Sequence, residues 1–126
     1  MQGSVAGAFN IEELNTELFF VTLNKSDKDF SPTTQYDDYV VSEYQFHWQS
    51  QNTDSHSNKG RRFVLQATNK KKFLLFVREY KRDGFGNTCP FYYFGLIDYI
   101  SSTGDKPMSI NWRMQQPILP QFLKIG

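Results

Sequence analysis

The sequence has 126 residues, a length that suits one domain with a single core and excludes a second catalytic domain beside it. Aromatic residues make up 17% of the chain and only one cysteine is present, so the composition favours β structure and excludes an internal disulfide. The formal net charge of +1 argues against a nucleic-acid partner when taken alone, and no apolar stretch is long enough to cross a membrane.

The first 17 residues predict a flexible lead. Residues 1–10 are small and polar, and they lack the basic and apolar segments of a signal peptide, so we expect a cytoplasmic protein. Asn10 could cap a short helix over the acidic residues that follow it. We therefore expect a lead over residues 1–17 and a single β-rich domain over residues 18–126.

A buried strand and a loop are predicted next. The apolar run from Leu18 to Leu23 is rich in Phe and β-branched residues and is too short for a stable helix, so it predicts a buried strand. Residues 24–35 contain Asn, Ser, Asp and Pro, which favour a loop.

The stretch from residue 44 to residue 51 alternates between aromatic and polar side chains, which predicts a strand with one aromatic face. The aromatic face comprises Tyr44, Phe46 and Trp48, and the polar face comprises Gln45, His47, Gln49 and Gln51. Such rings either form the core or line a ligand pocket. For Tyr44 and Phe46 we favour the core, because the periodicity explains them without a ligand.

A strongly basic segment follows. Residues 59–82 contain nine basic residues and one acid, a balance of +8, whereas the remainder of the chain carries −7. This asymmetry indicates either a surface that faces a polyanion or a solvated hairpin whose lysines protect strand edges. Within the segment, residues 61–68 and residues 73–80 predict two strands, with Lys70 to Lys72 at the tip between them.

The remaining elements are also strands. Residues 81–90 contain two glycines, an Asn and a Pro and predict a hairpin loop. Residues 91–100 predict a strand in which Gly95 marks a bulge. Residues 108–118 alternate so that Met108, Ile110, Trp112 and Met114 share a buried face. Altogether we expect about six strands with little helix, spaced as in small sandwiches and barrels.

The sequence offers little for catalysis. It has two histidines and none of the common zinc, nucleophile or phosphate-loop motifs, so we expect neither an enzyme nor a metal or cofactor site. Glu79 and Lys81 follow an apolar strand, as a magnesium carboxylate and a lysine do in some nucleases. We favour the simpler interpretation, an ion pair of little energy at the end of a strand, because a Glu and a Lys two positions apart occur often by chance.

Binding of a flipped base suits the region from residue 36 to residue 51 better. A base lifted out of a nucleic-acid stack needs flat rings beside it and polar groups at its Watson–Crick edge. Rings that could stack are Tyr36, Tyr39 and Trp48, and polar groups that could read the edge are Asp38, His47, Gln49 and Gln51.

Four segments carry a resemblance to a known family: "LFFVTLNKSDKDFSPTTQYDDYVVSEYQFHWQSQN", "LLFVREYK", "YYFGLIDYISSTGDKPMSINWRM" and "QPILP". In this order they resemble the C-terminal domain of bacterial proteins that join a phospholipase-D-type nuclease to a helicase, over Leu18 to Pro120. These proteins are similar to ATP-dependent type IV restriction enzymes, which cut foreign DNA with methylated or hydroxymethylated cytosine. The resemblance implies an SRA-like, PUA-like fold of the α+β class, a mostly β, curved and partly open β-barrel. It adds weight to the segment from His47 to Gln51.

We therefore expect a non-catalytic module that binds double-stranded DNA and flips 5-methylcytosine or 5-hydroxymethylcytosine into a pocket, with nuclease and helicase domains of a parent chain as partners and no membrane. The expected contacts to DNA phosphates are Arg61, Arg62, Lys70, Lys71, Lys72, Arg78 and Lys81. The alternative is a structural domain that couples nuclease to helicase and never touches a base; it predicts an apolar interface patch instead of a deep pocket.

Overall fold

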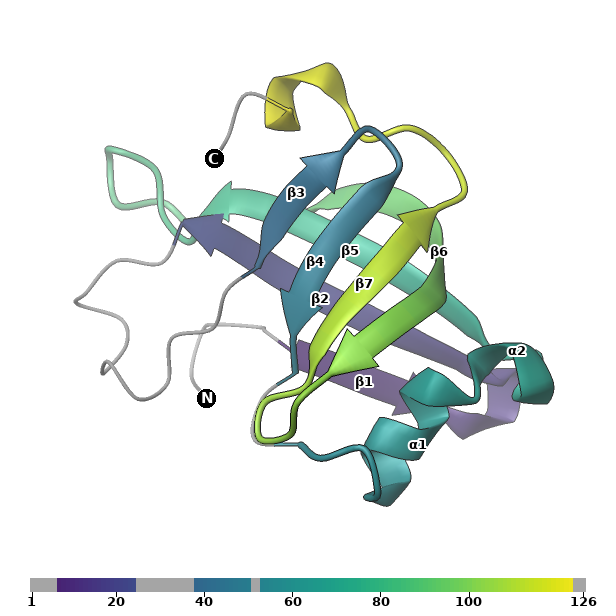
Figure 1. Cartoon of the computed structure of the whole chain (residues 1–126). Coiled ribbons are helices and arrows are strands. Elements are labelled where there is room, and N and C mark those ends of the chain that lie inside the picture. Colours follow the sequence, from purple (N-terminus) through teal and green to yellow (C-terminus); the bar gives the residue numbers. More distant parts are fainter. Residues whose placement is uncertain (1–6, 25–37, 51–52, 124–126) are drawn as a thin grey trace.

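A computed structural model describes residues 7–24, 38–50 and 53–123. A strongly curved seven-stranded sheet dominates it, with two short helices at one end (Figure 1). The elements are β1 (Gly7–Ile11), η1 (Glu12–Leu14), β2 (Thr16–Asn24), β3 (Tyr39–Ser42), β4 (Gln45–Gln49), α1 (Asn58–Val64), α2 (Gln66–Asn69), β5 (Lys72–Tyr80), β6 (Tyr92–Thr103), β7 (Ser109–Met114) and η3 (Pro120–Phe122).

The strands lie in the order β1-β2-β5-β6-β7-β4-β3. β2 and β5 pair in parallel and every other neighbouring pair is antiparallel, so the sheet is mixed. The expectation of a mostly β protein is therefore confirmed. The strand number is seven instead of about six, and the sheet is not closed, so the expected barrel is not confirmed.

The core lies on the concave side of the sheet. Phe19 of β2 and Trp48 of β4 belong to strands far apart in the sheet order, yet their ring centroids are 5.2 Å apart. The sheet therefore curls until its two halves share one aromatic core. Phe63 of α1 closes the end of this core, with its ring 5.6 Å from both Phe19 and Trp48.

Gly95 contributes to this curvature, as its position in a strand pattern predicts. Its φ of 95° lies in the region that favours glycine, and the β5–β6 register shifts between Leu75 and Phe76, opposite Gly95. A bulge of this kind bends a strand and increases its twist. The structure also contains the strands that the sequence predicts over Leu18–Leu23, residues 73–80 and residues 91–100. The alternation in and before β7 is also confirmed, because its apolar face is buried: Met108, Ile110, Trp112 and Met114.

The strand predicted over residues 61–68 is wrong, because these residues lie in α1 and α2. The Ser57 hydroxyl caps α1 by accepting a hydrogen bond from the Gly60 backbone N–H at 3.0 Å. Gly60, Phe63 and Gln66 are buried at a spacing of three residues, which is helical. The Gln66 amide then holds β6, donating to the Ile97 carbonyl and accepting from the Tyr99 N–H.

The N-terminal region also differs from expectation. Residues 7–11 form strand β1 instead of a flexible lead, pairing from Gly7 opposite Phe20 to Ile11 opposite Thr16. Asn10 lies within this strand and caps no helix; residues 12–14 form only a 3-10 turn, without a side-chain cap. Pairing with β2 provides hydrogen-bond partners for the backbone N–H and C=O groups of residues 7–11, and a marginal short helix is therefore not needed to satisfy them. The predicted loop after Asn24 lies outside the described residues.

Candidate functional site

The structure separates the predicted base-pocket residues. Tyr36 and Gln51 lie outside the described residues. Trp48 is 4% exposed and packs in the core, so its ring is not available to a ligand on the surface. Phe46 is buried as expected, but Tyr44 lies in the turn between β3 and β4 and is exposed instead of in the core.

Tyr39 and His47 form a ring pair in which Tyr39 is exposed and His47 is partly buried. They are direct partners across the β3–β4 pairing, and their rings stack with centroids 4.4 Å apart and planes 22° from parallel. Tyr39 is 44% exposed, and β3 is an edge strand of the sheet. A half-exposed ring held flat against a second ring is preorganised for stacking on another flat group.

Polar groups lie beside this pair. The Asp38 carboxylate accepts a hydrogen bond from the Gln49 N–H at 3.0 Å, and the Gln49 side-chain amide donates to the Ser109 hydroxyl at 3.1 Å. We call Asp38, Tyr39, His47 and Gln49 the ring-pair site. Its residues lie on β3 and β4, with Asp38 immediately before β3. The carboxylate, imidazole and amide groups of the site can exchange hydrogen bonds with a heterocycle.

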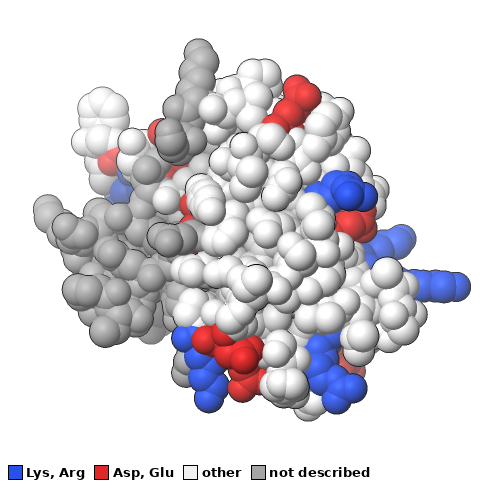
Figure 2. All heavy atoms as spheres, viewed as in Figure 1, with Lys and Arg blue, Asp and Glu red and all other residues white. Residues whose placement is uncertain are grey.

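The face that carries β3, β4 and β7 has few charges. Figure 2 shows mostly uncharged residues at its centre, whereas Lys and Arg side chains gather toward the right and lower edges, with acidic side chains beside several of them. Contacts at this face would therefore depend on rings, amides and hydroxyls more than on net charge.

The basic segment does not form one surface. Lys59, Arg61 and Lys70 to Lys72 lie in or next to α1 and α2, whereas Lys81 and Arg82 begin the hairpin at the opposite end of β5 (Figure 1). A strand of nine residues separates these ends by roughly 25–30 Å. A duplex that contacts one end need not contact the other.

Arg78 of β5 has an internal role. The residue is 2% exposed; its Nε donates to the Thr22 hydroxyl at 2.8 Å, its Nη1 donates to the Cys89 carbonyl at 3.2 Å, and the guanidinium lies 4.3 Å from the Phe91 ring centroid. Burial lowers the pKa of Arg78 from its ordinary value. These contacts tie β5 to β2 and to the chain before β6, and they leave Arg78 poorly placed to reach a phosphate.

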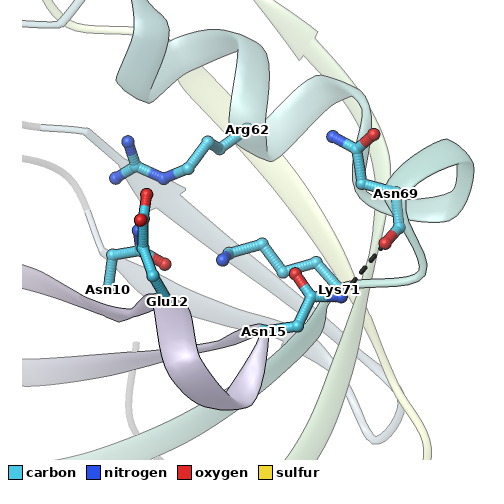
Figure 3. Close-up of a pocket in the computed structure, with 6 residues that line it drawn as sticks. All are labelled: Asn10, Glu12, Asn15, Arg62, Asn69 and Lys71. Carbon is cyan, nitrogen blue, oxygen red and sulfur yellow. Dashed lines mark hydrogen bonds between the residues drawn. The ribbon is translucent and has the colours of Figure 1, made fainter.

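A polar hollow lies where β1 and η1 meet the helices. It has a volume of about 260 Å³, and its lining residues are Asn10, Glu12, Asn15, Arg62, Asn69 and Lys71 (Figure 3). Sequence reasoning singled out Arg62 and Lys71 here, but it assigned Asn10 and the acidic residues after it to a short helix and gave none of the Asn and Glu residues of the lining a binding role. No local motif marks them, because strand pairing and helix packing bring them together from segments more than 50 residues apart.

The comparisons with known proteins give one assignment. The family profile of Domain of unknown function (DUF3427) matches residues 1–124, nearly the whole chain. The chain belongs to this family. A search of curated proteins found no match.

Four rings form a row on the outer face of the sheet of this DUF3427 chain. Phe9, Phe20, Phe76 and Tyr93 come from the neighbouring strands β1, β2, β5 and β6, and successive ring centroids are 5.8, 4.9 and 5.2 Å apart. Phe9 and Tyr93, at the two ends, are each about half exposed. We call these residues the outer ring row; an exposed apolar surface of this kind is typical of docking interfaces.

Neither a metal-binding cluster nor a membrane-spanning helix is found in the part of the chain that the structure describes. Within residues 7–24, 38–50 and 53–123, no three His, Cys, Asp or Glu side chains are grouped so that they could hold a metal ion. Within the same ranges, no helix has the length and apolar character to cross a membrane.

Proposed function

We propose that this domain binds DNA and recognises a modified cytosine, 5-methylcytosine or 5-hydroxymethylcytosine, by base flipping at the ring-pair site. In a longer parent protein it would direct a restriction nuclease, with its helicase, to foreign DNA. The observation that carries the proposal is the Tyr39–His47 stack, with the Tyr39 ring exposed, beside the Asp38 carboxylate at an edge of the sheet.

The chemistry of cytosine suits this arrangement. The Tyr39 ring offers a face on which an extruded base can stack, and Asp38 could accept a hydrogen bond from the exocyclic amine of cytosine. His47 holds the Tyr39 ring from behind, so little conformational entropy is lost on binding. Gln49, anchored by Ser109, could exchange hydrogen bonds with the remaining polar edge.

The test is a titration of the whole chain with three duplexes of one sequence that carry cytosine, 5-methylcytosine or 5-hydroxymethylcytosine. We expect tighter binding to a modified duplex, and we expect Tyr39→Ala to lower that affinity by about tenfold, the typical effect of one base–ring stack. Tyr80→Ala is the matched control, because Tyr80 is exposed to a similar degree at the far end of β5. Equal affinity of the wild type for all three duplexes would refute modified-base recognition.

A coupling domain without base recognition is the second candidate, and the outer ring row is the observation that favours it. Such a domain would use the ring row to pack against a nuclease or a helicase. It predicts no binding to any of the three duplexes at low salt, and it predicts that Tyr39→Ala has no effect on DNA affinity.

A further inference from the structure

Lys71 is a largely buried residue whose ammonium group reaches the polar hollow. The residue is 8% exposed, and no hydrogen-bond or ion-pair partner for its ammonium group lies within the described residues. Figure 3 shows this side chain pointing into the polar hollow, toward Asn10 and Glu12. Among the described residues, the one fully buried side-chain polar atom without a partner is Asn10 Oδ1, so the Lys71 ammonium keeps some exposure to the hollow. It is therefore accessible to water or to a ligand there.

The backbone holds Lys71 in this place. Its N–H donates to the Gln66 carbonyl at 3.1 Å, and its carbonyl accepts from the Gln66 side-chain amide at 3.2 Å. Gln66 is itself buried and bonded to β6. These bonds fix the backbone of Lys71 beside the hollow, and its side chain extends from that fixed point.

Arg62 supplies a second donor from the other side of the hollow. Its Nε and Nη2 bind the two oxygens of the fully buried Glu17 carboxylate, at 3.1 and 3.2 Å. This bidentate pair neutralises Glu17 and fixes the guanidinium plane. The remaining nitrogen, Nη1, has no partner among the described residues, so it is open to a ligand.

Hydrogen-bond acceptors also line the hollow. Asn10 Oδ1 is buried and has no hydrogen-bond partner within the described residues, and the Glu12 carboxylate lies near it (Figure 3). A ligand that matches this hollow must therefore carry hydrogen-bond acceptors for Lys71 and Arg62 and also a hydrogen-bond donor for Asn10 or Glu12. A fully deprotonated anion meets only the first condition, because Glu12 repels it.

We propose that the hollow binds a phosphate group that retains an ionisable oxygen, either inorganic phosphate or a terminal phosphomonoester. At neutral pH a phosphomonoester carries negative charge and also, in part, an O–H donor, because its second pKa lies near 6. Inorganic phosphate has a higher second pKa and retains more of this O–H donor. The volume of about 260 Å³ holds a tetrahedral ion together with several waters, each of which takes up about 30 Å³. This site is separate from the ring-pair site and does not depend on base recognition there.

The first experiment titrates the whole chain with inorganic phosphate and, separately, with sulfate, which has a similar shape but no O–H donor at neutral pH. We expect phosphate to bind more tightly than sulfate. Lys71→Met should weaken phosphate binding by about tenfold or more, the effect of losing a charge-assisted hydrogen bond. Lys106→Met is the matched control, because it removes the same charge from an exposed residue outside the hollow and outside the expected DNA contacts, and it should leave the affinity unchanged.

A second variant keeps the test decisive if Lys71→Met fails to fold. Glu12→Gln removes the negative charge of an exposed residue that would repel sulfate. We therefore expect it to strengthen sulfate binding and to reduce the ratio of phosphate affinity to sulfate affinity. No phosphate binding by the wild type at millimolar concentration would overturn the proposal, as would equal binding of phosphate and sulfate. Equal effects of Lys71→Met and Lys106→Met on phosphate affinity would overturn it as well.

The source of the phosphate is identified with two unmodified duplexes, one with 5′-phosphate ends and one with 5′-hydroxyl ends. Preference for the phosphorylated ends, abolished by Lys71→Met and by competing inorganic phosphate, would identify a nucleic-acid terminus. Equal affinity for both duplexes, together with phosphate binding, would identify free phosphate. Lys71→Met should retain any discrimination between modified and unmodified cytosine, so failure of one proposal leaves the other intact.

Discussion

Individual aromatic residues in this protein owe their roles to the side of the sheet on which they lie. Phe46 and Trp48 of β4 point into the concave core, whereas His47 of the same strand and Tyr39 of the neighbouring β3 lie at the surface. Alternation along β4 is sufficient to place Phe46, His47 and Trp48 on their correct faces. Tyr44 breaks the pattern because the chain turns there to join β3, and the amino-acid identities around it give no strong turn signal.

Replacement of Trp48 by Ala tests its assignment to the core. We expect Trp48→Ala to lower the free energy of unfolding by ~3–5 kcal/mol, because it leaves a large cavity among Phe19, Phe63 and Trp112. Urea denaturation measures the loss, and Tyr44→Ala at the exposed turn should change little. If Trp48→Ala were as stable as the wild type, the assignment of Trp48 to the core would be wrong.

At the scale of elements, the segment over residues 57–69 shows where local pattern is insufficient. Its apolar residues fit a strand as well as a short helix, and α1 and α2 are too short to be stable alone. Packing of Phe63 against Phe19 and Trp48, together with the Gln66 bonds to β6, selects the helix. These partners are distant in sequence, so a local window cannot contain them.

Gly60 gives a test of this helix packing. A Cβ at position 60 would overlap the carbonyl group of Asp54. This group belongs to the backbone, so it cannot rotate away as a flexible side chain could. We expect Gly60→Ala to destabilise the protein by about 1–3 kcal/mol, even though Ala is the better helix former by about 1 kcal/mol. Thermal or urea unfolding measures this difference. Gly84→Ala, where the added methyl group meets open space, should have a much smaller effect.

At the scale of the whole molecule, the fold divides the basic segment between two ends of β5. If the end next to α1 and α2 contacts DNA, the double variant Lys70→Gln, Lys72→Gln should weaken binding to all duplexes alike. It should also reduce the slope of log affinity against log salt by about 1.8, since each phosphate contact contributes about 0.9. Arg82→Gln, at the hairpin end, should leave the slope unchanged. An equal reduction by both variants would show that DNA contacts both ends of the strand.

The same division explains why charge along the sequence is a poor guide to surface charge. Nine basic residues lie within 24 positions, yet Arg62 pairs with the buried Glu17 and Arg78 is buried against Thr22, Cys89 and Phe91. Pairing and burial depend on which strands become neighbours. The sequence therefore predicts the excess of charge in this segment but not where that charge is accessible.

The sequence by itself determined the main strands, their buried faces and the bulge at Gly95, because these features depend on a period of two and on the conformational freedom of one residue. The tertiary structure alone decided how far the sheet curls, that residues 58–69 are helical, and that Lys71, Arg62, Asn10 and Glu12 line one hollow. Those outcomes depend on packing and charge pairing between segments far apart in the chain, and such contacts have no local signature.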